Sequence, residues 1–300
     1  ILGITPFNFP INLVCHKLAP AIAGGNAIII KPTSATPLTA LLLAEVVRES
    51  GLPAGALSVL PCDTAVAEKM VKDDRLKMLT FTGSAQVGWR LKAVAGKKKV
   101  VLELGGNAGA IVDKDADLEL AARRSAYGAF VYSGQTCISL QRLFVHEEVY
   151  RPFLDLLIGH VKGLKAGNPM DEDTSIGPLI TPDAAKRVEE WLKESVSQGA
   201  RVLLGGKLLG NNIIEPAVVV DTRPDMKINC EEAFGPVVTV SKFSSFERAI
   251  EEINQSRYGL QAGVFTNDVN KIFMAYRSLK VGGVIVNDVP TFRADHMPYG

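Results

Sequence analysis

The sequence predicts an α/β fold, in which a doubly wound parallel sheet is followed by a second α/β unit with a mostly parallel sheet. Short apolar runs alternate with amphipathic stretches of helical length along the 300 residues. Alternation of this kind favours parallel strands joined by helical crossovers. Several of the apolar runs are continuous rather than alternating with polar residues, which indicates strands covered on both faces.

The first strand and helix show this pattern with clear boundaries. The run 27–32 (AIIIKP) is a continuous apolar strand that ends at a proline. The following helix has Thr36 as N-cap, Pro37 at its first position and Gly51 just past its last turn. Both elements fit a helix-covered parallel sheet.

The remaining elements extend the alternation to the end of the chain. In the first part we expect strands over 57–60, 77–81 and 99–104, and a helix from Gly83 with Val87, Leu91 and Val94 on its apolar face. In the second part we expect helices over 118–132, 149–164 and 181–199 and from 246, and strands over 142–145, 218–220, 237–240, 263–266 and 284–286. The glycine pair Gly105–Gly106 is the expected boundary, giving domains 1–105 and 106–300.

Composition narrows the possible functions. The formal net charge is +1 and no long basic stripe occurs, so we expect no nucleic-acid partner. No apolar run approaches the roughly 20 residues that span a bilayer, so we expect no membrane partner. The four cysteines are at least 47 residues apart, which suits a reducing, cytoplasmic location and argues against zinc or a redox dithiol. His146 and Glu147 begin a zinc-protease-like pattern, but Tyr150 stands where the second histidine would be, so we expect no metal.

The two ends of the sequence read as interior segments. Ile1 opens what looks like the middle of a strand, without an initiator Met or a basic leader, and the chain stops at Gly300 without a cap. We therefore expect a fragment that lacks the N-terminal part and the C-terminal tail of a longer protein.

Two residues, Cys137 and Glu103, are candidates for a catalytic role. Cys137 lies in the short polar loop 133–139 (SGQTCIS), and Glu103 precedes a glycine pair in 102–107 (LELGGN). A thiol nucleophile and a carboxylate base on flexible loops suit acyl transfer. The structural alternative is that Cys137 is a small core residue and Glu103 a strand-end surface charge.

The usual nucleotide-binding fingerprints are absent. Neither G-x-G-x-x-G nor the P-loop pattern occurs. The nearest glycine motif is 82–88 (TGSAQVG), which follows a strand and opens a helix, so its free N–H groups and the Ser84 hydroxyl suit a phosphate. An ordinary serine N-cap is the alternative.

The chain resembles the aldehyde dehydrogenase superfamily over essentially its whole length. The resemblance rests on the segments 5–10 (TPFNFP), 30–33 (IKPT), 81–84 (FTGS), 103–107 (ELGGN) with 134–137 (GQTC), and 231–237 (EEAFGPV). It implies an incomplete Rossmann-like cofactor domain over 1–105 and a catalytic domain carrying the cysteine over 106–300. It also implies NAD(P)-dependent oxidation of a small aldehyde to a carboxylic acid.

The resemblance also implies roles for individual residues. Cys137 is the nucleophile that forms a thiohemiacetal and then a thioester, Asn8 stabilises the oxyanion, and Glu103 is the general base. The implied cofactor-binding residues are Lys31, Ser34, Gly83, Ser84, Leu104, Glu232 and Phe234.

Position 34 departs from the pattern of family members that prefer NAD, which often have Glu there. Ser34 lacks the negative charge that repels a 2′-phosphate, and Lys31 can attract that phosphate. We therefore expect NAD or NADP as cofactor, with NADP tolerated or preferred.

Substrate and product fate stay open at this stage. The segment 287–293 (NDVPTFR) is similar to that of members acting on small oxygenated aldehydes such as lactaldehyde or glyceraldehyde derivatives. Arg142 and Arg293 are candidates to face an acidic substrate, although a structural role is the alternative for each. Other interpretations are a coenzyme-A-acylating enzyme, against which Glu103 counts, a cysteine hydrolase without cofactor, and an inactive fragment. The resemblance implies a homodimer or homotetramer for the parent enzyme.

Overall fold

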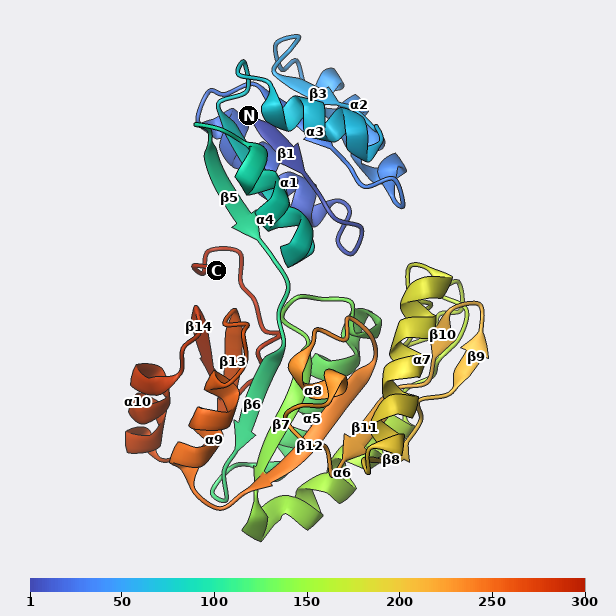
Figure 1. Cartoon of the computed structure of the whole chain (residues 1–300), viewed down its shortest axis with the longest axis vertical. Helices are drawn as coiled ribbons and strands as arrows, with labels where there is room; N and C mark the ends of the chain where they lie inside the picture. The colour runs from blue at the N-terminus through green and yellow to red at the C-terminus, as the bar shows by residue number, and fades with distance from the viewer. Residues whose placement is uncertain (300) are drawn as a thin grey trace. The chain divides into compact units, whose positions relative to one another are not determined.

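The computed structural model describes residues 1–299 and divides into two compact units, Ile1–Gly105 and Gly106–Gly300 (Figure 1). The chain therefore changes units within the glycine pair Gly105–Gly106. In the described residues no helix is long and apolar enough to cross a membrane. The four cysteines are free thiols.

The first unit is built on a five-stranded parallel sheet with the order β3-β2-β1-β4-β5. Its strands are β1 (Leu2–Ile4), β2 (Ile28–Lys31), β3 (Leu57–Val59), β4 (Met78–Thr82) and β5 (Lys99–Glu103). Its helices are α1 (Asn12–Ala23), α2 (Pro37–Glu49), α3 (Thr64–Lys72) and α4 (Ala85–Val94). From β1 the chain builds outward in one direction, then crosses over and builds in the other, which is the doubly wound topology.

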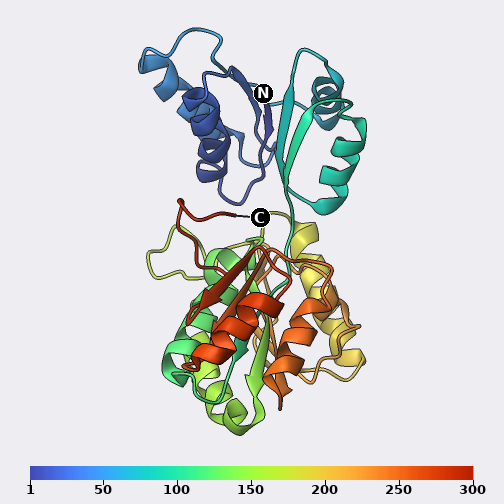
Figure 2. The same ribbon diagram turned by 90° about the vertical axis from the view of Figure 1, so that its left-hand side faces the viewer.

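Each face of this sheet is covered by two helices (Figure 2). Apolar residues of α1 and α2 pack with β2 and β3 in one core, centred on Val14, Leu18 and Ile30. Residues of α3 and α4 form a second core with β1 and β4 on the other face. Strand β1 lies between β2 and β4, where the strand order reverses, and ligands of such folds bind at the carboxyl ends of the strands beside this point.

The second unit contains a seven-stranded sheet with the order β14-β13-β6-β7-β12-β11-β8, in which only β8 is antiparallel to its neighbour. Its strands are β6 (Ala108–Val112), β7 (Leu140–His146), β8 (Arg201–Leu204), β11 (Ala217–Val220), β12 (Val237–Phe243), β13 (Gln261–Phe265) and β14 (Gly283–Val286); β9 (Leu208–Gly210) and β10 (Ile213–Ile214) form a separate hairpin. Its helices are α5 (Leu118–Phe130), α6 (Tyr150–Lys162), α7 (Pro182–Ser197), α8 (Lys227–Cys230), α9 (Phe246–Asn254) and α10 (Val269–Ser278), with short 3₁₀ turns η1 (Val131–Gly134) and η2 (Glu147–Val149).

Three apolar clusters stabilise this unit. Helices α5 and α6 pack together on the central strands around Phe130, Phe153 and Leu157. Helix α7 forms a cluster with β11, and α9 and α10 form one with β6 and β13. The central strands are buried throughout, which explains the apolar runs read from the sequence.

Several details differ from the sequence expectations. Thr36 precedes α2 but makes no side-chain cap hydrogen bond. Val87 is 36% exposed, whereas Leu91 is buried as expected and Gly88 is buried beside it. The expected helix 118–132 ends at Phe130, because the backbone turns left-handed at Tyr132. The helices α1, α3, α8 and α10 and the strands β6, β8, β9 and β10 were not expected.

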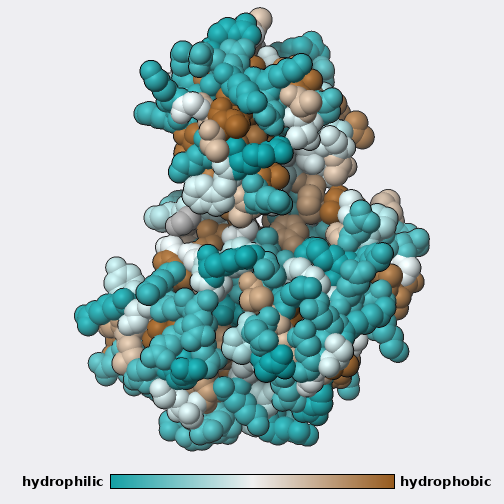
Figure 3. Space-filling model, viewed as in Figure 1, coloured by the Kyte–Doolittle hydropathy of each residue, from teal (hydrophilic) through white to brown (hydrophobic). Residues whose placement is uncertain are grey.

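Hydrophilic residues cover most of the face shown in Figure 3, where hydrophobic residues occur in small groups. Helix α2 nevertheless exposes Leu38, Leu42 and Val46 by more than half.

Candidate active site

The loop that carries Cys137 has an unusual backbone. It joins α5 to β7, and three consecutive residues, Tyr132, Ser133 and Gly134, have φ between 57° and 69°. Only glycine adopts this left-handed region without cost, so the two preceding residues store strain of about 1–3 kcal/mol each. A side chain at Gly134 would overlap the carbonyl oxygen of Gly235. The loop therefore holds a conformation that the surrounding structure imposes.

Buried hydrogen bonds hold this loop in place. The Ser133 hydroxyl donates to the Gly177 carbonyl at 2.9 Å. The Gln135 side-chain oxygen accepts from the Ile180 N–H at 2.9 Å. Cys137 itself is only partly buried, so its thiol is presented at the surface of a fixed loop.

Gly106 connects Cys137 with the predicted cofactor residue Glu232. A Cβ added to Gly106 would overlap the Cys137 carbonyl oxygen, so the two backbones touch. The N–H of the same glycine donates to Oε1 of Glu232 at 2.8 Å. The second glycine of the ELGGN segment is thus required by close packing, and it places the Cys137 loop and the Glu232 loop beside each other.

Glu232 is an unusual carboxylate. Burial raises its pKa from 4.5 to about 7, against the opposing effects of the Gly106 N–H and the Arg187 cation. Arg187 also donates to the Glu232 carbonyl at 3.2 Å. Phe234, two residues on, has φ 46°, so the Glu232 loop also contains a strained residue. Partly exposed polar and aromatic side chains held this way suit binding of a polar ligand.

A buried glutamine ties the Glu232 loop to the strand that follows Cys137. The Gln141 amide nitrogen lies 2.8 Å from the carbonyl oxygens of both Ile228 and Glu231, and its oxygen accepts from the Ala233 N–H at 2.9 Å. No sequence signal indicated this network, because nothing in the residue pattern marks Gln141 as inward-facing.

The C-terminal segment packs against the Cys137 loop. Thr291 Oγ1 lies 2.8 Å from the Gly128 carbonyl oxygen and 3.0 Å from that of Ile138, the residue after Cys137. Farther along, the Tyr299 hydroxyl lies 2.8 Å from Sγ of Cys137. Tyr299 was not among the expected site residues.

In the first unit, the predicted residues lie at the carboxyl edge of the parallel sheet. Asn8 is buried in the loop after β1, and Lys31 ends the neighbouring β2, where its carbonyl accepts from the Thr5 N–H at 3.2 Å. Glu103 ends β5, paired in register with Thr82 of β4. These residues therefore lie along the edge of the sheet at which a doubly wound fold binds its ligand.

The start of α4 forms the second part of this edge. The Gly83 N–H donates to the Glu103 carbonyl at 3.0 Å, and Ser84 occupies the N-cap position without a side-chain cap bond. A Cβ at Gly88 would lie 2.5 Å from Leu104 Cδ2, so Leu104 packs against the first turn of this helix. Ser34 is exposed after β2. Ser84 therefore lies at the N-cap position without the side-chain hydrogen bond that an ordinary serine N-cap makes.

Lys17 is a buried cation that the sequence reading missed. It is 7% exposed and donates to the Thr80 and Thr82 hydroxyls at 3.1 and 2.8 Å. Burial lowers its pKa from 10.5 to about 8, and the nearby Glu103 carboxylate partly offsets that fall. A signal was available, because Lys17 shares the helix face of the buried residues Val14 and Leu18.

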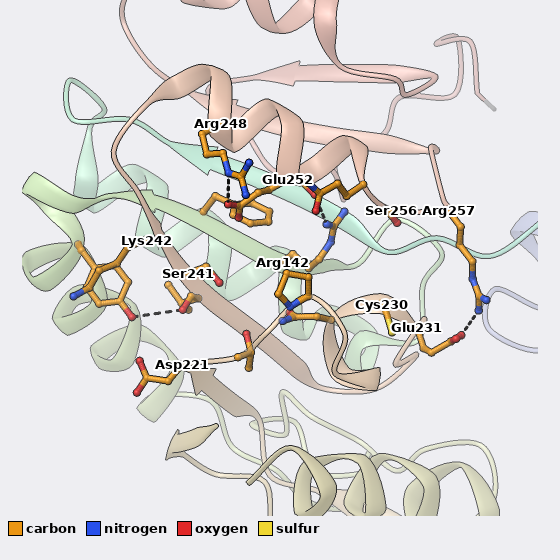
Figure 4. A pocket seen from close by; sticks show the side chains of 17 residues that line it. Arg142, Asp221, Cys230, Glu231, Ser241, Lys242, Arg248, Glu252, Ser256 and Arg257 are labelled. Atoms are coloured by element: carbon orange, nitrogen blue, oxygen red, sulfur yellow. Dashed lines mark hydrogen bonds and ion pairs between the residues drawn. The ribbon is translucent and has the colours of Figure 1, made fainter. Parts of the chain in front are cut away.

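A cavity of about 710 Å³ in the second unit is lined by other residues, among them Arg142, Cys230 and Glu231 (Figure 4). Arg142, at its inner end, donates to the carbonyls of Asn107, Glu252 and Ile253 and has a structural role, as the alternative reading proposed. At the rim, Arg257 is paired with Glu231, and Arg248 with Glu252. The cationic groups are thus engaged with the protein itself.

No cluster of three or more metal-binding side chains occurs among residues 1–299. His146, which opened the rejected zinc pattern, accepts from the Glu148 N–H at 3.2 Å and packs edge-on against Phe243.

Comparison with known proteins places the chain in context. A model of the aldehyde dehydrogenase family matches residues 1–300. A 3-sulfolactaldehyde dehydrogenase from Priestia aryabhattai is 48% identical over 301 residues, which cover 100% of this chain and 63% of that protein. A lactaldehyde dehydrogenase from Methanococcus vannielii is 45% identical over 303 residues, covering 99% of this chain and 65% of that protein. The chain thus spans less than two thirds of the length of these curated relatives.

Solved structures agree in fold. Aldehyde dehydrogenase 21 from Physcomitrella patens, in complex with the reaction product succinate, matches with TM-score 0.97 and 48% identity over 100% of this chain and 63% of that chain. Glyceraldehyde-3-phosphate dehydrogenase from Methanocaldococcus jannaschii, complexed with NADP, matches with TM-score 0.96 and 38% identity over 100% of this chain and 66% of that chain. The predicted fold class and the resemblance stated from the sequence are confirmed.

Proposed function

Since the chain belongs to the aldehyde dehydrogenase family, we propose that its protein oxidises a small aldehyde to a carboxylic acid with NAD or NADP. In this proposal the first unit binds the cofactor and the second supplies the nucleophile. The observation that carries the proposal is the presentation of Cys137 on a strained loop that is anchored by buried hydrogen bonds. Such a loop fixes the position of a nucleophile before substrate binds.

The chemistry takes place at the Cys137 sulfur. Its thiolate attacks the carbonyl carbon, so a carbon–sulfur bond forms and the carbonyl π electrons move to the oxygen. By resemblance to the family, we assign Asn8 as the donor to that oxyanion, and loss of one such donor typically costs about 3 kcal/mol of barrier. When the oxyanion collapses, the aldehyde hydrogen leaves with two electrons and a thioester remains on Cys137.

Glu103 acts in the second half of the reaction. Its carboxylate removes a proton from water, the resulting hydroxide attacks the thioester carbon, and the carbon–sulfur bond breaks to release the carboxylic acid. The adjacent Lys17 cation favours the ionised form of Glu103, which is the form a base needs.

The residues at the carboxyl edge of the first sheet fit a dinucleotide. The start of α4 offers N–H groups and the positive end of a helix dipole for the pyrophosphate, beside Gly83 and Ser84. Lys31 would hold the adenosine ribose, with the neutral Ser34 tolerating a 2′-phosphate, and Glu232 would hold the nicotinamide ribose with Phe234 packed nearby. A bound nicotinamide supplies the acceptor for the hydride.

The substrate we propose is a small oxygenated aldehyde. The relatives named for sulfolactaldehyde and lactaldehyde support this class. Arg293 was a candidate for an acidic substrate, but its guanidinium lies over the Tyr299 ring and donates to the Met297 carbonyl at 3.3 Å. We therefore assign it to the protein rather than to the substrate.

The test uses the full-length protein with lactaldehyde and either cofactor. Cys137→Ala should abolish oxidation while cofactor binding persists, and retained turnover would remove Cys137 from the nucleophile role. Glu103→Gln should release one equivalent of reduced cofactor and then stall at the thioester. Product analysis with added coenzyme A separates the acid from an acyl-coenzyme A, and ester cleavage without cofactor would indicate a hydrolase instead.

A further inference from the structure

The Cys137 sulfur has a polar neighbour from the far end of the chain. The Tyr299 hydroxyl oxygen lies 2.8 Å from Sγ, at hydrogen-bonding distance. The two residues are 162 positions apart in sequence, so the fold alone brings them together. In geometry alone, either atom can be the donor.

The protonation chemistry decides which atom donates in the reactive state. A phenol ordinarily ionises near pH 10 and a thiol near pH 8.5, so the sulfur loses its proton first. A thiolate carries no proton, and the contact then requires the phenol to donate. A hydrogen bond made to the charged form of a group favours that form, and bonds to charged groups are worth about 1.5–3 kcal/mol.

The ring of Tyr299 is held in position by its own segment. The Arg293 guanidinium lies 4.4 Å from the ring centroid, a cation–π distance. Arg293 also donates to the Met297 carbonyl at 3.3 Å, and the Met297 N–H donates to the Ala294 carbonyl at 2.9 Å, which closes a turn before Tyr299. At the start of this segment, Thr291 contacts the residue after Cys137.

We propose that Tyr299 is a catalytic residue whose hydroxyl donates a hydrogen bond to the Cys137 sulfur and stabilises the thiolate before the aldehyde binds. This rests on the proposed function, because it assumes that Cys137 is the nucleophile. The thiol proton leaves to solvent or to a base, and the Tyr299 proton stays on its oxygen. Once the carbon–sulfur bond forms, the sulfur is neutral and a poor acceptor, so the hydroxyl is released to bond an oxygen of the substrate. Arg293 is a positioning residue that acts through the ring.

The test measures the thiol itself and needs no turnover. In the full-length protein, alkylation of Cys137 by iodoacetamide is followed by peptide mass spectrometry from about pH 5 to 10, a range that covers the ordinary ionisation of both groups. Tyr299→Phe keeps the ring and removes only the donor. We expect the midpoint of the rate profile to rise by about one pH unit. Alkylation at neutral pH should slow about three- to fourfold, because a tenfold smaller thiolate fraction is partly offset by a more nucleophilic thiolate, and the high-pH plateau should show no slowing.

The same molecule contains its own controls. Cys15, Cys62 and Cys230 should alkylate at unchanged rates, and Tyr276→Phe, on the exposed side of α10, should leave all four profiles unchanged. A Cys137 profile that superimposes on the parental one overturns the proposal. So does a change that all four cysteines share, because that indicates general loosening.

A second variant tests the opposite direction. Replacing Tyr299 with 3-fluorotyrosine makes the hydroxyl a stronger donor at nearly the same size, so alkylation of Cys137 below about pH 7, where the more acidic phenol still keeps its proton, should be faster than in the parent. An alkylation rate in that pH range that falls or stays constant refutes the donor role. If instead Cys137→Ala remains an active dehydrogenase, the proposed function fails, whatever the alkylation profiles show.

Discussion

Replacing Lys17 by Met should make the protein more stable and less active. Met has a similar length and packs in the same apolar face of α1, but it carries no charge. Lys17 is 7% exposed, so its ammonium group is largely removed from water. The group donates hydrogen bonds to the hydroxyls of Thr80 and Thr82. A buried cation is costly for folding even when it is hydrogen-bonded.

The size of the effect follows from the pKa of Lys17. Burial lowers it from 10.5 to about 8, which at 1.36 kcal/mol per pH unit is about 3 kcal/mol of folding free energy lost while the group is charged. Relative to a neutral lysine amine in the same place, Met also loses two hydrogen bonds to the threonine hydroxyls, worth about 1 kcal/mol each. We therefore expect the Met variant to gain about 1–2 kcal/mol at pH 7.

The pH dependence of stability tests separately whether the charged Lys17 destabilises the fold. Between about pH 8 and 10.5 the unfolded chain keeps the Lys17 proton and the folded chain releases it, so parental stability from this group rises with pH across that window. The Met variant lacks this rise in stability. Its advantage in free energy of unfolding over the parent should therefore shrink with pH and reverse above about pH 10.

The assay is chemical denaturation of the full-length protein at several pH values, with turnover measured in parallel. Lys97→Met, in an exposed turn, is the matched control and should change neither stability nor turnover. Because the Lys17 cation favours ionised Glu103, the Lys17→Met turnover profile should move to higher pH. A variant that is less stable than the parent at pH 7, with the same pH slope, would refute the reasoning.

Two further predictions concern the loops. Gly106→Ala should cost about 1–3 kcal/mol of stability and greatly slow alkylation of Cys137, because the new methyl overlaps a backbone carbonyl that has no rotamer to change; equal alkylation rates in a thiol assay would contradict the close packing. Ser34→Glu should shift cofactor preference at least about tenfold toward NAD through repulsion of the 2′-phosphate. Thermal-shift titration of both cofactors measures that preference, and an unchanged ratio would separate Ser34 from the choice of cofactor.

Much of the fold could be predicted from local patterns. Continuous apolar runs marked the buried strands, and proline and glycine marked the ends of α2, because these signals depend on residues close in sequence. The predicted helix boundaries were wrong where tertiary contacts determine them. Helix α5 ends two residues earlier than expected because the backbone turns left-handed at Tyr132, which the conformational preferences of Tyr do not indicate.

The candidate site was predictable only in part, for a similar reason. Cys137 and Glu232 stood out because each lies in a recognisable motif. Gln141 and Tyr299 did not, since their roles come from partners 87 or more residues away. Lys17 lies between these cases, because a charge on an apolar helix face is visible in sequence but its partner on β4 is not.

The strain around Cys137 indicates what the surrounding contacts achieve. Tyr132, Ser133 and Phe234 adopt left-handed conformations, at a combined cost of several kcal/mol. A relaxed loop would avoid that cost, so the buried bonds of Gln141 and the backbone packing of Gly106 must more than offset it. These contacts come from Gln141 on β7 and from Gly106, and they hold the Cys137 loop and the Glu232 loop against one another. A substitution that relieved the strain would therefore stabilise the loops and misplace the sulfur, which is the relation expected between stability and activity when a nucleophile is positioned in advance.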